Sequence, residues 1–98
     1  MVSHPEGVQR LTAVARGRVQ GVGFRFFVLD HARAAGVVGF VRNLPDRRGV
    51  EVVAEGLTDQ LERLLREIES GPAGAKVEFV DASWAAPTGQ FVEFRMEV

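Results

Sequence analysis

The spacing of the apolar residues switches between a period of two and a helical period along this sequence, and the order of the switches restricts the possible folds. From 11 to 19, an apolar residue or glycine occupies every second position, as in a strand with one buried face. Beyond this segment, apolar residues recur at helical spacing instead: Phe24, Val28, Ala32 and Ala35. The switch predicts a strand that leads, through a short turn, into a helix with one apolar face.

Two further strands are predicted after this helix. Gly36 stands where a helix C-cap is expected, and strands are predicted at 37–42 and 50–55. The segment between them, 44–49, contains proline, aspartate and glycine, which favour a hairpin loop. Gly56 is expected to end the second of these strands.

A second helix and two more strands complete the pattern. Thr58 is a good N-cap, and a strong apolar stripe follows until Gly71 and Pro72 end the helix. The stripe consists of Leu61, Leu64, Leu65 and Ile68. A strand is predicted at 76–85, and the alternation of apolar and charged residues over 92–98 predicts a short final strand.

This order of elements predicts an α+β domain with a ferredoxin-like βαββαβ sandwich and a short extra C-terminal strand. Two helices, each with one apolar face, can cover one face of a single antiparallel sheet. We assign 8–98 to this domain, and we expect the second apolar stripe to be buried with Phe24 and Val28. Residues 1–7 are short and polar, so a flexible tail without a signal peptide is expected there.

Composition and charge argue against several functional classes. The net charge is −1 and the pI about 6.1, which does not suit wholesale electrostatic binding to nucleic acid. No apolar run approaches the ~20 residues of a membrane span. The absence of cysteine fits a cytoplasmic protein. His4 lies in the tail and His31 in the first helix without an evident partner, and no metal or cofactor is expected.

The turn between the first strand and the first helix has the composition of an anion site. The run from Gly17 to Arg25 reads GRVQGVGFR. A glycine-bearing turn leaves backbone N–H groups free at the positive end of the helix, which attracts anions. Arg25 falls in the first helical turn, where its planar guanidinium can hold two phosphate oxygens. A cation there is unfavourable without a bound anion, so its position points to a site.

Two familiar phosphate motifs are excluded for this run. A P-loop needs Gly-Lys-Ser/Thr after its glycines, and the sole lysine is Lys76. A dinucleotide fingerprint needs a third glycine where Phe26 stands. Phe26 and Phe27 are instead expected to pack in the core or to border a pocket. The alternative explanation is a tight turn in which glycine serves the backbone geometry alone.

The same run resembles the signature of the acylphosphatase family. A second family element resembles Gly39 to Asn43, which reads GFVRN, with Asp46 close behind. The resemblance extends from about Leu11 to Phe94, and two separated motifs in the right order make it specific. It implies hydrolysis of acyl phosphates to a carboxylate and inorganic phosphate, and it implies the same ferredoxin-like fold.

The resemblance also implies roles for individual residues. Arg25 would bind phosphate, and Asn43 would position the attacking water, with which its amide can both donate and accept hydrogen bonds. Asparagine at a strand end is also a common turn former. The cradle of N–H groups would come from Gln20, Gly21, Val22, Gly23, Phe24 and Arg25. A monomer without cofactor is expected, with inorganic phosphate as its product and inhibitor.

The sequence departs from the family pattern after Asn43. The family usually has Asn-x-x-Asp-Gly-x-Val, whereas the segment from Asn43 to Val50 is one residue longer, with its glycine displaced to Gly49. We therefore expect an altered hairpin tip, with less effect on Asn43 itself.

Two alternative functions are considered. Ferredoxin-like domains include RNA-binding modules that stack bases on sheet aromatics. Phe40 suits such a module, but Glu51 and Val53 stand where further aromatics are needed. The second alternative is a non-catalytic module that binds an acyl or carbamoyl phosphate, since acylphosphatase-like domains also occur fused to larger carbamoyl-transfer proteins. The sequence ends at Val98 without such a partner, which favours a free-standing enzyme.

Overall fold

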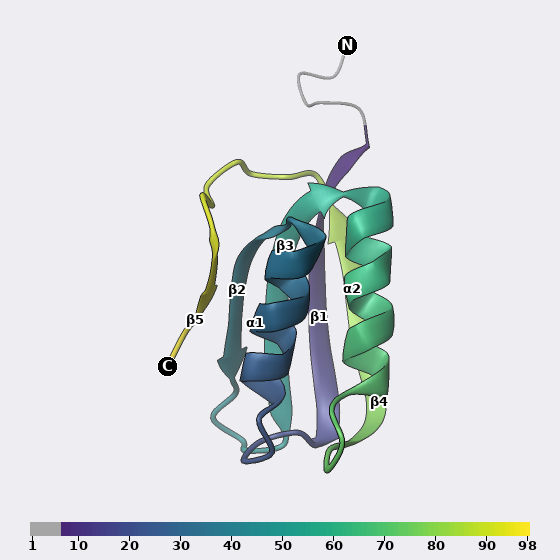
Figure 1. Cartoon of the computed structure of the whole chain (residues 1–98), viewed down its shortest axis with the longest axis vertical. Coiled ribbons are helices and arrows are strands. Elements are labelled where there is room, and N and C mark those ends of the chain that lie inside the picture. The colour runs from purple at the N-terminus through teal and green to yellow at the C-terminus, as the bar shows by residue number, and fades with distance from the viewer. Residues whose placement is uncertain (1–6) are drawn as a thin grey trace.

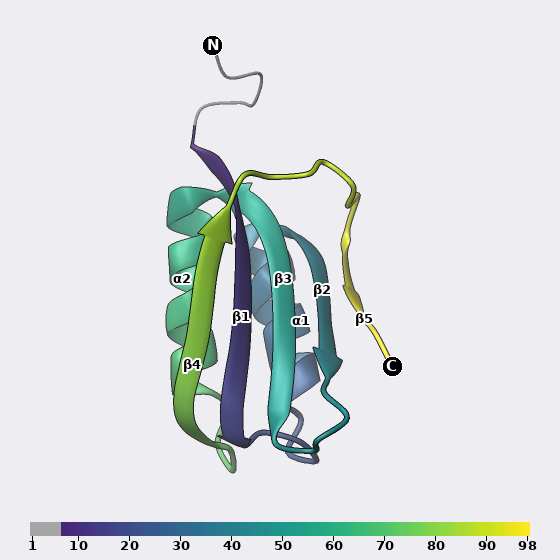
Figure 2. The same ribbon diagram turned by 180° about the vertical axis from the view of Figure 1, so that it is seen from behind.

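The computed structural model describes residues 7–98, which form one five-stranded sheet and two helices. Along the chain the elements are β1 (Val8–Arg18), α1 (Phe24–Ala35), β2 (Val38–Asn43), β3 (Gly49–Leu57), α2 (Thr58–Ser70), β4 (Lys76–Ala85) and β5 (Phe94–Met96). Both helices cover the same face of the sheet (Figure 1), and the opposite face is open when seen from behind (Figure 2). The predicted ferredoxin-like arrangement is confirmed. None of the described helices is long and apolar enough to cross a bilayer.

The strand order is β4-β1-β3-β2-β5, and the sheet is mixed rather than wholly antiparallel. The four long strands pair antiparallel, as predicted. The short β5, however, pairs parallel with β2. After β4 the chain crosses the end of the sheet and returns along the opposite edge, so β5 runs in the same direction as β2 (Figure 2). Val92 and Val98, expected in this strand, lie outside it and are exposed.

The core lies between the two helices and the sheet. The buried faces of the strands and the apolar faces of both helices meet in it, and its members include Leu11, Ala13, Ala15, Phe24, Val28, Val41, Val52, Leu61, Leu64 and Ile68. Leu65, expected to be buried with them, is only partly buried and packs against the edge of the core. It lies one residue after Leu64 and is therefore rotated about 100° away from it around the helix.

Two element boundaries differ from the sequence prediction. Gly56 does not end β3, because its backbone pairs with Gln9 of β1. Thr58 is the first residue of α2 rather than its N-cap, which is Leu57. The hydroxyl of Thr58 donates to the carbonyl of Gly7 at 2.8 Å. The backbone N–H of Leu57 donates to the side chain of Gln60 at 2.9 Å. Gly36 is the C-cap of α1, as predicted.

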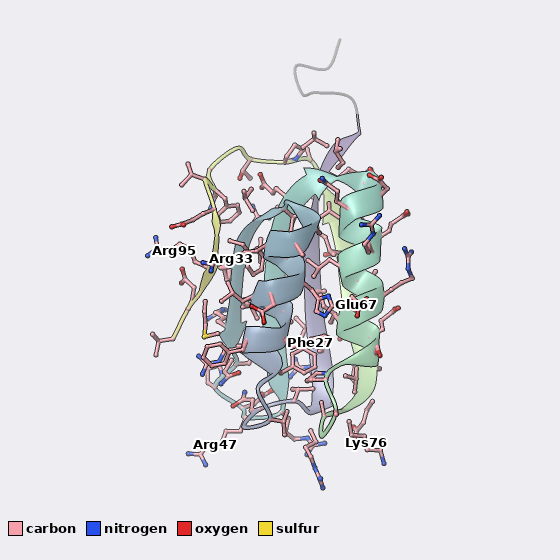
Figure 3. The ribbon with its side chains drawn as sticks, in the orientation of Figure 1. Phe27, Arg33, Arg47, Glu67, Lys76 and Arg95 are labelled. Atoms are coloured by element: carbon pink, nitrogen blue, oxygen red, sulfur yellow. The ribbon has the colours of Figure 1, made fainter. Side chains whose placement is uncertain are left out.

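Three connections meet at one end of the molecule: β1 to α1, β2 to β3, and α2 to β4 (Figure 1). Figure 3 shows Arg47 and Lys76 at this end. The β1–α1 turn and the last residue of β2, Asn43, belong to these connections as well. The link from β4 to β5 crosses the other end. Apart from Gly7, the expected tail at 1–7, with His4 in it, lies outside the described residues.

Candidate active site

The turn between β1 and α1 requires glycine for its backbone geometry. Gly21 and Gly23 have φ angles of 76° and 77°, and Gly23 is the N-cap of α1. Residues with a side chain rarely adopt this left-handed conformation. A Cβ atom at either position would meet no atom within 4 Å, so the requirement comes from the φ angle and not from lack of space.

The turn presents a run of backbone donors with no protein acceptor. The first helical hydrogen bond runs from the N–H of Phe27 to the carbonyl of Gly23 at 3.0 Å, so the three preceding N–H groups have no helical acceptor. Within residues 7–98, the N–H groups of Gln20 to Gly23 donate to no backbone carbonyl either. The first turn of α1 contains no acidic residue. This positive end of the helix is therefore uncompensated by the protein itself.

Arg25 adds a charged donor beside these N–H groups. Its Nη1 donates to the backbone carbonyl of Glu97 at 3.2 Å. The N–H of Glu97 in turn donates to the carbonyl of Val41 at 2.8 Å, which holds this acceptor against β2. Arg25 takes part in none of the ion pairs among the described residues. Because a guanidinium has five N–H donors, most of them stay available to an anion.

Asn43 is the last residue of β2 and pairs with Val50 across the hairpin. Its side chain is half-buried. Among the side-chain hydrogen bonds of residues 7–98, none involves the amide of Asn43. The remaining bonds in this part of the chain do not involve it either. The amide is therefore free to bind a water or a ligand.

One small hollow of about 100 Å³ brings most of the predicted site residues together. It is lined by Val19, Gly21, Gly23, Phe24, Arg25, Phe26 and Asn43. Gln20 and Val22 do not line the hollow. The side-chain amide of Gln20 donates to the carbonyls of Leu44 and Gly49, both at 2.8 Å. Val22 packs against the core. The cradle role of every N–H group from Gln20 to Arg25 stays a prediction, and only Gly21, Gly23, Phe24 and Arg25 of this run line the hollow.

In the hairpin tip, Arg47 has a positive φ angle of 65°. Asp46 stabilises this turn, since its carboxylate accepts the N–H of Arg48 at 3.0 Å and pairs with Arg16 at 2.6 Å. The hydrogen bond from the Arg48 N–H, and then Arg16, lower the pKa of Asp46 below its ordinary value. The pairing of Asn43 with Val50 is regular, and an altered tip relative to the family stays a prediction.

The structure shows contacts near the site that the sequence did not reveal. His31 has a partner: its Nε2 lies 3.8 Å from Oε1 of Glu67 on α2, and its ring is tilted against that of Phe27 with centroids 4.4 Å apart. Figure 3 shows Phe27 on α1 and Glu67 on α2. Nothing in the sequence indicated that the carbonyl of Glu97 contacts Arg25, because every residue has a backbone carbonyl. Within residues 7–98, no group of three or more histidine, cysteine or acidic side chains could hold a metal ion.

The βαββαβ sandwich, with free backbone donors in its β1–α1 turn beside an arginine outside the ion pairs, defines a class of small α+β protein whose turn is suited to an anion. The family model for acylphosphatases matches residues 11–96. The chain is 49% identical to an acylphosphatase of Deinococcus radiodurans over 80 residues, which cover 82% of this chain and 91% of that protein. This chain therefore belongs to the acylphosphatase family, and it hydrolyses acyl phosphates.

Solved structures agree with this assignment. The crystal structure of acylphosphatase from Bacillus subtilis superposes with a TM-score of 0.88 at 29% identity, covering 92% of this chain and 99% of that one. Full-length HypF, solved in a phosphate- and nucleotide-bound form, matches with a TM-score of 0.84 at 26% identity. The match covers 93% of this chain but only 12% of HypF. The likeness to whole acylphosphatases does not favour the alternative of a non-catalytic module.

Proposed function

We propose that the hollow binds the phosphoryl group of an acyl phosphate and that Arg25 and Asn43 carry the reaction. The observation that carries this proposal is the run of acceptor-free N–H groups from Gln20 onward, next to an arginine without an ion pair. These donors suit the equatorial oxygens of a phosphoryl group, on which charge is spread in the transition state. Arg25 compensates that charge, and Asn43 holds the water.

The proposed reaction is an in-line displacement at phosphorus. The oxygen of the water held by Asn43 forms the new bond to phosphorus as the bond to the acyl oxygen breaks. The electron pair of the broken bond leaves with the carboxylate. A substrate phosphate oxygen takes the proton of the water, because an amide is not a strong base. Catalysis is thus positioning plus preorganised charge, and the described residues supply both without a metal ion.

Turnover of benzoyl phosphate, with inorganic phosphate as a competitive inhibitor, tests this proposal. Arg25→Ala should weaken phosphate inhibition and slow turnover by ~10²-fold or more, because it removes a charged, preorganised donor. Arg25→Lys should restore little of the phosphate inhibition or the turnover, since an ammonium group lacks the planar set of donors of a guanidinium. Arg66→Ala, on the exposed side of α2, is the matched control and should change neither quantity. Normal phosphate inhibition in Arg25→Ala would refute the cradle, and loss of activity in EDTA would show that a metal takes part.

We further propose that the protein acts as a monomer in the cytoplasm. The absence of cysteine supports the cytoplasmic location, because disulfides are common in exported proteins and rare in proteins of the reducing cytosol. The edge strand β4 supports the monomer, since it starts with Lys76 and carries Glu78 and Asp81, charges that discourage edge-to-edge pairing. Light scattering should give 10.7 kDa, and a mass of twice that value would contradict the monomer.

A further inference from the structure

Phe26 is an exposed apolar ring that lines the hollow. Its side chain is 63% exposed, although it lines the hollow together with Arg25 and Asn43. The other apolar side chains that line the hollow, Val19 and Phe24, are both 1% exposed and belong to the core. Phe26 is therefore the lining residue that offers apolar surface to something entering from solvent.

The neighbouring phenylalanines show that Phe26 is not part of the aromatic packing of α1. Phe24 and Phe27 contact one another with ring centroids 6.1 Å apart, and the ring of Phe27 also contacts that of His31 at 4.4 Å. Phe26 has no ring partner among the described residues. It lies two positions after Phe24, about 200° around the helix, and so faces away from the core. Nothing in the packing of the protein accounts for a large apolar side chain here.

The substrate supplies a partner for this ring. An acyl phosphate has a charged phosphoryl end and an acyl end, and the hollow is small at about 100 Å³. If the phosphoryl group occupies the donors of the β1–α1 turn, the acyl group must extend toward the mouth. Phe26 directly follows Arg25, which grips the phosphoryl end, so its ring is the nearest exposed apolar surface along the chain.

We propose that Phe26 forms an acyl subsite that favours acyl phosphates with an aromatic or bulky apolar acyl group over those with a small one. This inference rests on the proposed binding of the phosphoryl group at the β1–α1 turn. An aryl group that packs on the ring removes apolar surface of both partners from water and adds the preference of aromatic pairs for tilted or offset contact. An acetyl group has too little surface to gain much. The subsite therefore changes selectivity between substrates and leaves the chemistry at phosphorus unchanged.

Comparison of two substrates across Phe26 variants tests the subsite. For Phe26→Ala, kcat/KM for benzoyl phosphate should fall ~10-fold, whereas kcat/KM for acetyl phosphate should change less than ~2-fold. Phe26→Leu keeps apolar surface without the ring, so its kcat/KM for benzoyl phosphate should lie between the values of Phe26→Ala and the parent. The inhibition constant of inorganic phosphate should stay unchanged in both variants, because phosphate has no acyl group.

A second exposed phenylalanine offers a matched control. Phe79 on β4 is 54% exposed and does not line the hollow, so Phe79→Ala should leave both substrates unaffected. The thermal midpoint of Phe26→Ala should match that of the parent, since alanine suits a helix and little of the ring is buried. If Phe26→Ala loses kcat/KM equally for both substrates, or loses none for benzoyl phosphate, the proposed subsite is wrong.

The two proposals fail in different ways in this experiment. If the phosphoryl group does not bind at the turn, Arg25→Ala keeps the parent's phosphate inhibition constant, and this outcome does not depend on the results for the Phe26 variants. If only the acyl subsite is wrong, Arg25→Ala still weakens phosphate inhibition while the ratio of the two substrates is insensitive to Phe26.

Discussion

Arg25 and Asn43 line the same hollow but differ in what holds them there. The guanidinium of Arg25 is tied to the carbonyl of Glu97, which is itself bonded to β2. Asn43 is placed by the register of β2 against β3, and its amide has no protein partner among the residues the structure describes. Arg25 is thus suited to contact the phosphoryl group throughout the reaction, whereas Asn43 is suited to hold a water that the ground-state complex does not need.

The kinetics of Asn43→Ala should reflect this difference. Loss of the amide removes the positioning of water, so kcat should fall by ~10²–10³-fold. Phosphate inhibition should stay nearly intact, because the phosphate donors lie elsewhere. Measurement of kcat, KM and the phosphate inhibition constant separates this result from that of Arg25→Ala, in which binding weakens as well.

A thermal midpoint completes the comparison of the two variants. Neither Arg25 nor Asn43 is in the buried core, so both variants should stay folded. An Asn43→Ala enzyme with the parent's kcat would remove Asn43 from the mechanism. A variant that loses phosphate binding together with turnover would assign Asn43 to the cradle instead.

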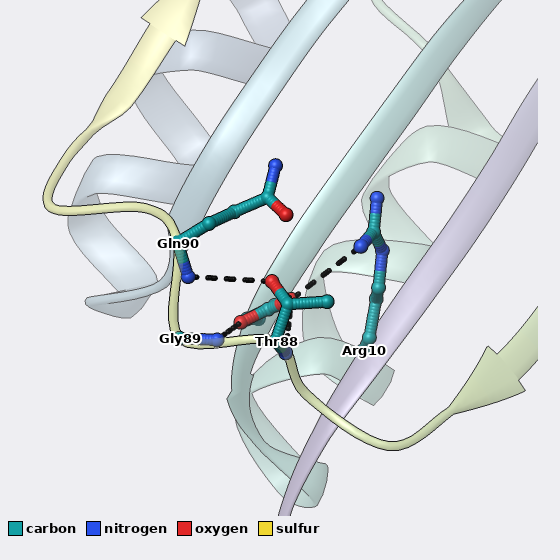
Figure 4. Close-up of polar contacts among 5 residues, drawn as sticks. Arg10, Thr88, Gly89 and Gln90 are labelled. Carbon is teal, nitrogen blue, oxygen red and sulfur yellow. Dashed lines mark hydrogen bonds and ion pairs between the residues drawn. The ribbon is translucent and has the colours of Figure 1, made fainter.

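At the scale of elements, Glu55 of β3 anchors the link between β4 and β5. This carboxylate is 4% exposed. It accepts the N–H and the hydroxyl of Thr88 at 2.9 and 2.8 Å and the N–H of Gly89 at 3.0 Å. Arg10 of β1 lies 3.8 Å away. Figure 4 shows Arg10, Thr88 and Gly89 close to one another, with these contacts drawn as dashed lines. The cluster fixes the chain where it crosses the sheet to the opposite edge.

Glu55 should make the stability of the protein depend on pH in the acidic range. Burial by itself raises the pKa of Glu55, but the hydrogen bonds from Thr88 and Gly89, with Arg10, outweigh it and leave the pKa below its ordinary value of 4.5. A carboxyl whose pKa is lowered on folding stabilises the protein above its unfolded pKa, and this contribution is lost as pH falls through the folded value. The free energy of unfolding should therefore decline as the pH falls below about 4.5.

Urea titrations of Glu55→Gln at pH 7 and at pH 3 would measure this contribution. At pH 7 the variant should lose about 1–3 kcal/mol, because a buried set of donors loses its charged acceptor. The difference from the parent should be smaller at pH 3 than at pH 7, because the contribution of the charged carboxylate is lost as the pH falls below its unfolded pKa and through the lowered folded pKa. Glu69→Gln, at an exposed position of α2, is the control and should have no effect at either pH. A difference that does not change with pH would assign the loss to packing and not to charge.

The sequence predicted elements well where the signal was local. The strand at 76–85 was predicted with the bounds of β4, and Gly36 was predicted as a C-cap because it follows an apolar stripe at helical spacing; both are confirmed. Gly56 was misread because pairing with β1 outweighs the weak preference of glycine against strands. Thr58 was misread because capping depends on the backbone angles of Leu57 and on the reach of Gln60, which composition does not reveal.

At the scale of the whole molecule, what escaped prediction depends on long-range contacts. The parallel pairing of β5 with β2 and the burial of Glu55 both arise from the path of residues 86–93 across the sheet. Neither has a local signal, because β5 is only three residues long and glutamate in a strand usually faces water. The hollow was more predictable. Its donors and Arg25 are close neighbours in the sequence, and Asn43 was brought to it by family resemblance.

The stability of the molecule should depend strongly on the thin core between the helices and the sheet, and neighbouring leucines of α2 can test this. Leu64 is 1% exposed, whereas Leu65 is only partly buried. Leu64→Ala should lower the free energy of unfolding by ~2–5 kcal/mol, since it removes buried methyl groups and leaves a cavity. Leu65→Ala should cost about 1 kcal/mol, because water can fill the space left at the edge.

The larger of these losses is a substantial share of the ~5–15 kcal/mol that stabilises a small domain. Urea unfolding of both variants would measure it, with a constant slope showing that the unfolded state is unchanged. Neither leucine lines the hollow, so kcat measured where both variants are fully folded should equal the parent's. Equal losses for the two variants would mean that the core extends to the outer edge of α2. A Leu64→Ala variant that is stable but inactive would mean that the packing of α2 also positions the β1–α1 turn.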